Sequence, residues 1–165
     1  MPKDRDTPWL NDDEMRGWRS FIAAMNLVHR ALDRELRHSV DMTVDDYGVL
    51  VHLSEATDRR VRLGELAALL RVPKAHLTYR IQRMEKSGLV RRVGCDDDGR
   101  GVWAVMTPEG FERLKEAAPI HVAGVRRHVL DHWDAAQLSA VGDAMEALLH
   151  GHDGCCAGDG AASAP

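Results

Sequence analysis

The 165-residue sequence has little that would indicate a secreted or membrane protein. It contains three cysteines, two of them adjacent, and this odd number predicts no disulfide framework and favours a reducing compartment. No apolar run approaches the roughly 20 residues that a membrane-spanning helix requires. The polar, acidic N-terminal segment lacks the basic and apolar regions of a signal peptide. The sequence therefore predicts a cytoplasmic protein that has no membrane partner.

Motifs of the common catalytic classes are also absent. The sequence has no glycine-rich phosphate loop of the Walker type, no G-x-S-x-G nucleophile elbow and no H-E-x-x-H zinc motif. Acid pairs such as Asp45-Asp46 stand at predicted helix starts, where negative charge is favourable without any catalytic role. We therefore expect neither enzymatic activity nor a cofactor.

Positive charge is concentrated in one segment of the chain. The net charge is −4, but residues 71–101 carry eight lysines and arginines against four acids. A basic segment in an acidic chain favours a local surface that binds phosphate groups. The alternative interpretation is an ordinary solvated face, because arginine is abundant throughout this sequence.

The N-terminal part predicts one long amphipathic helix. Asn11, followed three residues later by Glu14, has the pattern of a capping box. From there the periodicity predicts a helix to about Arg37, and residues 38–42 are expected to form a loop. Such a helix would extend about 40 Å, more than one small domain covers, so its apolar stripe is expected to face a partner subunit. The stripe consists of Trp18, Phe21, Ile22, Met25, Val28, Leu32 and Leu36.

The next segment predicts three shorter helices and a very short strand. Thr43 is expected to cap the first helix, and Val61 to form the strand. Pro73 suits the first turn of the third helix, where its missing N–H costs nothing. Gly88 is expected to follow that helix in the left-handed conformation. The three helices are predicted over about 44–55, 63–70 and 73–86.

The C-terminal part predicts two helices and a disordered tail. Thr107 and Pro108 are typical of a helix start. Pro119, inside this helix, is expected to kink it or divide it in two. Asp134, with Gln137 three residues later, predicts the cap of a last helix. The predicted ranges are about 108–131 for the first helix, 135–149 for the second and 151–165 for the tail.

Two β-prone runs complete a winged helix-turn-helix pattern. The runs at about 89–93 and 102–106 flank a Gly/Asp-rich segment and predict a hairpin. The expected fold is therefore mainly α-helical, with a small β-hairpin wing and long helical dimerisation elements. The helix at 73–86 would enter a DNA major groove, which admits one α-helix. Its outer face would carry Lys74, Ala75, His76, Thr78, Tyr79, Gln82 and Arg83, with Arg80 at the flank.

The predicted tip of the hairpin carries a second candidate contact with DNA. Arg100 is expected to enter a minor groove, and Asp98 is expected to hold its guanidinium in place. The alternative is a protein-interaction module that keeps the winged fold without specific DNA binding. In that case the basic outer face would be merely solvated.

The motifs of residues 63–110 resemble those of the MarR (multiple antibiotic resistance regulator) family. Leu66-Ala67 resembles the family's "eLA", and Leu77-Thr78 with residues 83–90 resembles its "vT…RLe..GLV" segment. Residues 98–101 resemble the "D-x-R" signature of the wing, and residues 105–110 resemble "vxLTxeG". Pro73 and Ala75 depart from the serines that the family often has there, and Met84 replaces a leucine.

The resemblance implies a homodimeric transcriptional regulator. Two winged units would read a pseudo-palindromic double-stranded DNA operator, with half-sites about one helical turn apart. Residues 10–42 and 107–150 would form the helical dimerisation region, and residues 43–106 the DNA-binding domain. Lys74, His76, Thr78 and Arg80 would approach bases or nearby phosphates. Tyr79 and Arg83 would contact the DNA backbone, and Arg100 the minor groove.

The resemblance also implies a repressor that a small anionic or aromatic effector relieves. Its effector would lie between the dimerisation helices and the winged unit. The candidate pocket residues are Trp18, His29, Tyr47, His52, His121 and Arg126.

A zinc- or redox-responsive sensor remains a further alternative. His128 and His132 are spaced to share a metal ion on one helix, although the sequence shows no third ligand near them. Cys95, near Arg91 and Arg92, is a candidate for oxidation because nearby cations lower a thiol's pKa. We expect no bound metal, and solvated or packed side chains are the alternative for each residue. The other metal-capable residues are His150, His152, Cys155 and Cys156 in the predicted tail.

Overall fold

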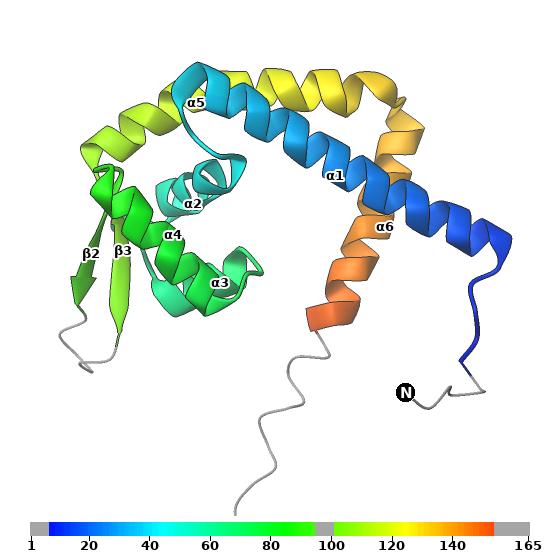
Figure 1. Cartoon of the computed structure of the whole chain (residues 1–165), viewed down its shortest axis with the longest axis horizontal. Coiled ribbons are helices and arrows are strands. Elements are labelled where there is room, and N and C mark those ends of the chain that lie inside the picture. Colours follow the sequence, from blue (N-terminus) through cyan, green and yellow to red (C-terminus); the bar gives the residue numbers. More distant parts are fainter. Residues whose placement is uncertain (1–6, 95–100, 154–165) are drawn as a thin grey trace, which may run out of the picture. The chain divides into compact units, whose positions relative to one another are not determined.

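The computed structural model describes residues 7–94 and 101–153 (Figure 1). The chain divides into two compact units, Met1–Gly124 and Val125–Pro165. Among the described residues, no helix combines the length and the apolar character needed to cross a bilayer. The fold is mainly α-helical with one small antiparallel sheet, as the sequence predicts.

Helix α1 (Asp12–Val40) begins as predicted and ends later than predicted. The Asn11 side chain accepts a hydrogen bond from the Glu14 N–H at 2.9 Å, and the Glu14 carboxylate accepts one from the Asn11 N–H at 2.8 Å. The prediction of a loop over 38–42 is wrong for residues 38–40. The helix ends only at Val40, because Asp41 is the first residue in the left-handed conformation (φ 48°). The Asp41 N–H donates to the Arg37 carbonyl and so caps the last turn.

The winged unit contains three helices and a three-stranded sheet of order β1-β3-β2; Figure 1 shows the hairpin of β2 and β3 beside α4. Strand β3 pairs with both neighbours, which places Val61 opposite Ala104 and Val90 opposite Met106. The predicted hairpin and the short strand at Val61 are confirmed. The elements are α2 (Val44–Glu55), a 3-10 turn (Thr57–Arg59), β1 (Arg60–Arg62), α3 (Leu63–Leu69), α4 (Lys74–Lys86), β2 (Val90–Gly94) and β3 (Val102–Met106).

One apolar core holds the winged unit together. The inner face of α4 supplies Leu77, Ile81 and Met84, each at most 1% exposed, as the predicted spacing requires. Burying an aliphatic side chain of this size contributes roughly 1.5–3 kcal/mol, so this face fixes which side of α4 turns outward. The fully buried side chains from the neighbouring elements are Leu36, Val49, Leu50, Leu53, Leu66 and Val90.

The turn between α3 and α4 differs from the prediction by one residue. Pro73 is the N-cap of α4, with an extended ψ of 135°, and not part of its first turn. Arg71 before it adopts a left-handed φ of 51°, and the Val72 N–H donates to the Ala67 carbonyl at 3.0 Å. After α4, Gly88 has a φ of 75°, as predicted for a residue that ends a helix.

Helix α5 (Pro108–His128) is continuous through Pro119. The predicted division at this proline is wrong, because Pro119 is exposed and water can solvate the carbonyl that loses its partner. Thr107 caps the helix as predicted, since its Oγ1 accepts from the Gly110 N–H at 2.9 Å. At Gly124 the helix closely approaches α1, where a Cβ would lie 2.7 Å from Leu32.

The second unit contains a 3-10 turn (Leu130–His132) and helix α6 (Ala135–Asp153). The cap formed by Asp134 and Gln137 is confirmed by hydrogen bonds of 2.8 and 3.0 Å. Helix α6 extends beyond its predicted end near Leu149, so the predicted disorder is wrong for residues 151–153. The rest of the predicted tail, residues 154–165, lies outside the described residues.

Candidate nucleic-acid interface

The outward face of α4 carries most of the predicted DNA-binding residues. Lys74, Ala75, His76 and Tyr79 are exposed, Tyr79 by 72%. Thr78 is half-buried, and its hydroxyl donates to the Lys74 carbonyl at 2.8 Å. Within the described residues no side chain caps the first turn of α4. The first N–H groups of a helix attract anions such as phosphate.

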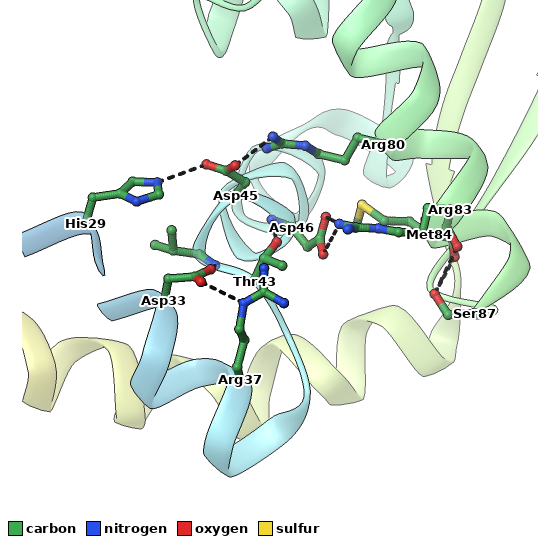
Figure 2. A network of polar contacts seen from close by, with 11 residues as sticks. His29, Asp33, Arg37, Thr43, Asp45, Asp46, Arg80, Arg83, Met84 and Ser87 are labelled. Atoms are coloured by element: carbon green, nitrogen blue, oxygen red, sulfur yellow. Dashed lines mark hydrogen bonds and ion pairs between the residues drawn. The ribbon is translucent and has the colours of Figure 1, made fainter. Parts of the chain in front are cut away.

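Two of the predicted contact residues form ion pairs with the start of α2 (Figure 2). Arg80 donates to Asp45 at 2.7 Å and is only 22% exposed. Arg83 donates to both carboxylate oxygens of Asp46 at 2.5 Å, while half of its side chain remains exposed. These pairs anchor α4 against α2. The sequence pattern does not indicate these pairs, because the partners lie 35 and 37 positions apart and Asp45 and Asp46 have the pattern of helix-start acids.

The same start of α2 is tied to α1 (Figure 2). Asp33 accepts a hydrogen bond from the Val44 N–H at 3.1 Å and another from Arg37 at 2.6 Å. Burial alone would raise the pKa of Asp33, but these hydrogen bonds hold it below its ordinary value. His29 lies 3.4 Å from Asp45, the carboxylate that also holds Arg80. One polar network thus connects α1, α2 and α4.

A further ion pair fixes the wing against α4. Glu85 accepts hydrogen bonds from the Arg92 backbone N–H at 2.9 Å and from the Arg92 side chain at 2.7 Å. These two bonds lower the pKa of Glu85, because they stabilise its charged form. The bidentate geometry holds strand β2 in one position relative to the end of α4.

Replacing Glu85 by glutamine is expected to lower the midpoint of thermal unfolding near neutral pH. Because the folded pKa of Glu85 lies below the unfolded value, its contribution is complete above the ordinary glutamate pKa and is lost as the pH falls through the folded one. The difference between Glu85→Gln and the parent should therefore shrink in acid. Thermal scans across this range check it, with Glu112→Gln, from an exposed pair with Lys115, as the control. A difference that stays constant into acid would contradict the prediction.

The remaining predicted site residues are only partly brought together. Tyr47 and His121 stack with ring centroids 4.4 Å apart. Burial raises the pKa of Tyr47 and lowers that of His121, whose Nδ1 is buried with no hydrogen-bond partner among the described residues. Trp18 is 54% exposed and contacts Phe21 instead. The other predicted pocket residues lie elsewhere: His29 beside Asp45, His52 half-buried on α2, and Arg126 in the second unit.

Several candidates from the sequence cannot be placed. Asp98, Arg100 and Cys95 lie outside the described residues, and so do Cys155 and Cys156. In the ranges 7–94 and 101–153, no three histidine, cysteine or acidic side chains gather where they could hold a metal ion. The His128 side chain is engaged in a polar or ring contact. His132 is the last residue of the 3-10 turn before α6.

The fold and this exposed α4 face define a winged helix-turn-helix protein. Residues 40–101 match the sequence profile of the MarR family. AbsC, a MarR family regulator from Streptomyces coelicolor, is 36% identical with a TM-score of 0.84, over 90% of this chain and 99% of AbsC. Sco3205 from the same organism, solved in complex with DNA, is 39% identical with a TM-score of 0.83, over 87% of this chain and 93% of Sco3205.

A curated relative is more distant. The repressor YetL from Bacillus subtilis strain 168 is 29% identical over 105 residues, so the match spans 62% of this chain and 63% of YetL, just under two thirds. The similarity to AbsC and Sco3205 nevertheless extends over most of each chain. This chain belongs to the MarR family. It is a transcriptional regulator and not an enzyme.

Proposed function

We propose that this MarR-family regulator represses transcription by binding a pseudo-palindromic operator as a homodimer, and that a small-molecule effector releases it. The exposed polar face of α4, whose first turn has no side-chain cap among the described residues, carries the proposal. A relative that is 39% identical was solved in complex with DNA, which supports the same activity here. The repressor YetL supports the direction of regulation.

We assign the contacts as follows. Lys74, His76 and Thr78 reach base edges or nearby phosphates, and the methyl group of Ala75 suits a thymine methyl. Tyr79 contacts the DNA backbone. Arg83 does so with the part of its side chain that remains exposed, while its Nη2 stays bonded to Asp46. This set, with Arg100 and Asp98 proposed for the wing from sequence, positions and reads one half-site.

Arg80 has a different role from the exposed α4 residues in this proposal. Because its side chain is largely buried and paired with Asp45, it orients α4 and does not contact bases. Its contribution to DNA binding is therefore indirect, through the position of the helix that carries Lys74 and His76.

Exposed apolar side chains on the long helices support the homodimer. Trp18, Ile22 and Met25 on α1 are 38–55% exposed, although they form one stripe. Leu138 and Leu148 on α6 are also exposed. Apolar patches of this kind mark surfaces that a partner covers. The second protomer is the occupant we propose.

The stacked Tyr47–His121 pair supports an effector site within the first unit. The buried Nδ1 of His121 lacks a partner among the described residues, and such an atom costs free energy until it is hydrogen-bonded. A small aromatic ligand with a polar group would satisfy it. This supports the effector class that the family resemblance implies.

Operator binding by the purified protein tests the proposal. At near-physiological salt, the protein should bind some genomic fragments, including the region upstream of its gene, in clear preference to random duplex DNA. We expect His76→Ala to cost about 1–3 kcal/mol of binding free energy per half-site, as one base contact does, and so about twice that for the dimer. Lys74→Gln should reduce the slope of log K against log salt by about 2 for a dimer, one phosphate contact per protomer.

Lys115→Gln is the matched control, because it removes one cation from α5. It should leave both the affinity and the salt slope nearly unchanged. If no fragment is preferred over random duplex, the chain is better described as an interaction module that keeps the winged fold.

A further inference from the structure

One face of the three-stranded sheet gathers arginine side chains around a tryptophan. The strand register places one residue of β1 and one of β2 directly opposite each of Val105 and Trp103 on β3. Residues opposite one another in a sheet project from the same face. This surface, called here the outer wing face, consists of Arg60, Arg62, Arg91, Val93, Trp103 and Val105.

The outer wing face is turned away from the core that positions α4. The alternate residues of the same strands, among them Val61, Val90 and Ala104, belong to the buried cluster that also contains Leu77 and Ile81 of α4. Because successive side chains of a strand point to opposite faces, the arginines lie on the other side of the sheet. Their exposure agrees with this placement, since all three are exposed to solvent.

Trp103 orients two of these arginines. The guanidinium carbons of Arg60 and Arg62 lie 5.0 and 5.2 Å from the centroid of its ring system. A guanidinium group that stacks on an aromatic ring keeps N–H donors at its edge, and this arrangement suits phosphate recognition. The outer wing face therefore presents arginine donors whose orientation is partly fixed in advance.

The outer wing face keeps an excess of positive charge, because none of its six residues is acidic. Arg60 lies 3.7 Å from Asp58, but the two side chains are 51% and 69% exposed, so water weakens this pair. Arg91 has no side-chain hydrogen bond or ion pair within residues 7–94 and 101–153. Arg62 has a further partner, so the argument depends on Arg60 and Arg91.

We propose that Arg60 and Arg91 bind phosphates of the DNA that flanks the operator, beyond the minor groove proposed for Arg100. Strands β2 and β3 flank the segment that carries Arg100, so the outer wing face is continuous with the proposed DNA-binding surface. Arg60 and Arg91 both lie opposite Val105 on the two outer strands, about 10 Å apart. At that separation each can contact a different phosphate.

This inference rests on the proposed function, because it extends the contact with the operator outward. Phosphate contacts carry no sequence information. The affinity should therefore depend on the length of the flanking duplex and not on its sequence.

Fluorescence anisotropy with two duplexes tests the inference. Both come from the genomic fragment that the protein prefers. The short one spans the two half-sites and the adjacent minor grooves, and the long one adds about one helical turn of random sequence at each end. Arg60→Gln with Arg91→Gln should weaken binding to the long duplex about ten-fold, the combined effect of four exposed ion pairs in the dimer.

Salt dependence gives a second measure on the same duplexes. On the long duplex, this double variant should reduce the slope of log K against log salt by about 3–4, since the dimer loses four phosphate contacts. On the short duplex, both its affinity and its slope should remain close to those of the parent. Binding to the short duplex also shows that the wing of the variant is folded.

Two further variants separate this contact from a general loss of charge. Arg60→Lys with Arg91→Lys keeps both charges and should keep the slope within about one unit of the parent. Arg16→Gln with Arg19→Gln removes two exposed arginines from α1. It should leave the difference between the long and the short duplex unchanged.

Several results would overturn the inference while leaving the proposed function intact. A selective parent whose slope is the same on both duplexes makes no contact with the flanks. An unchanged slope in the glutamine variant would leave the outer wing face to solvent or to an acidic protein segment. Equal losses on both duplexes, or no recovery with lysine, would mean that these arginines act through the fold. A parent that prefers no fragment overturns both proposals.

Discussion

Replacing Gly110 by alanine is expected to destabilise the first unit by about 3 kcal/mol, at the upper end of the typical cost of overpacking. A Cβ at this position would lie 2.1 Å from the carbonyl oxygen of Leu89 and 3.0 Å from its carbonyl carbon. Because these are backbone atoms, no side-chain rotation can relieve the overlap. The start of α5 would have to move away from the turn that follows α4.

Existing hydrogen bonds oppose that movement. The Thr107 N–H donates to the Leu89 carbonyl at 3.1 Å, and the Thr107 hydroxyl donates to the Gly88 carbonyl at 2.6 Å. Urea unfolding of Gly110→Ala measures the cost. Gly64→Ala is the matched control, because no atom lies within 4 Å of its added methyl group. It should be neutral or slightly stabilising. Equal unfolding midpoints for Gly110→Ala and the parent would show that α5 does not start against Leu89.

Replacing Arg83 by methionine is expected to cost about 1–3 kcal/mol of stability. The carboxylate of Asp46 is buried, and Arg83 is the partner that holds both of its oxygens. Removing that partner leaves a buried charge without compensation. The expected cost stays below that of a fully buried pair because half of the Arg83 side chain is exposed to water.

A double-mutant cycle separates this effect from the loss of packing. Asp46→Asn in the Arg83→Met background removes the uncompensated charge and should recover part of the lost stability. The exposed pair Arg16–Asp13 provides the control cycle, since its side chains are 78% and 88% exposed and should couple weakly. Additive effects of Arg83→Met and Asp46→Asn would mean that the ion pair does not anchor α4 to α2 in solution.

Local patterns were sufficient to predict most elements of this fold. The caps at Asn11, Thr107 and Asp134 depend on side chains within three residues of the backbone groups that they satisfy. The buried face of α4 follows from the spacing of Leu77, Ile81 and Met84. The left-handed conformation of Gly88 follows from the conformational freedom of glycine. Each of these features depends on interactions between near neighbours in the sequence.

Tertiary contacts decided the features that local patterns missed. Where a predicted helix end was wrong, the physical reason is local: α1 continues until the left-handed Asp41, and α5 is not divided at Pro119 because that residue is exposed to water. The pairing of Arg80 with Asp45 and of Arg83 with Asp46 depends on how α4 packs on α2. A long arginine side chain can reach many carboxylates, so its partner is chosen only when packing brings distant segments together.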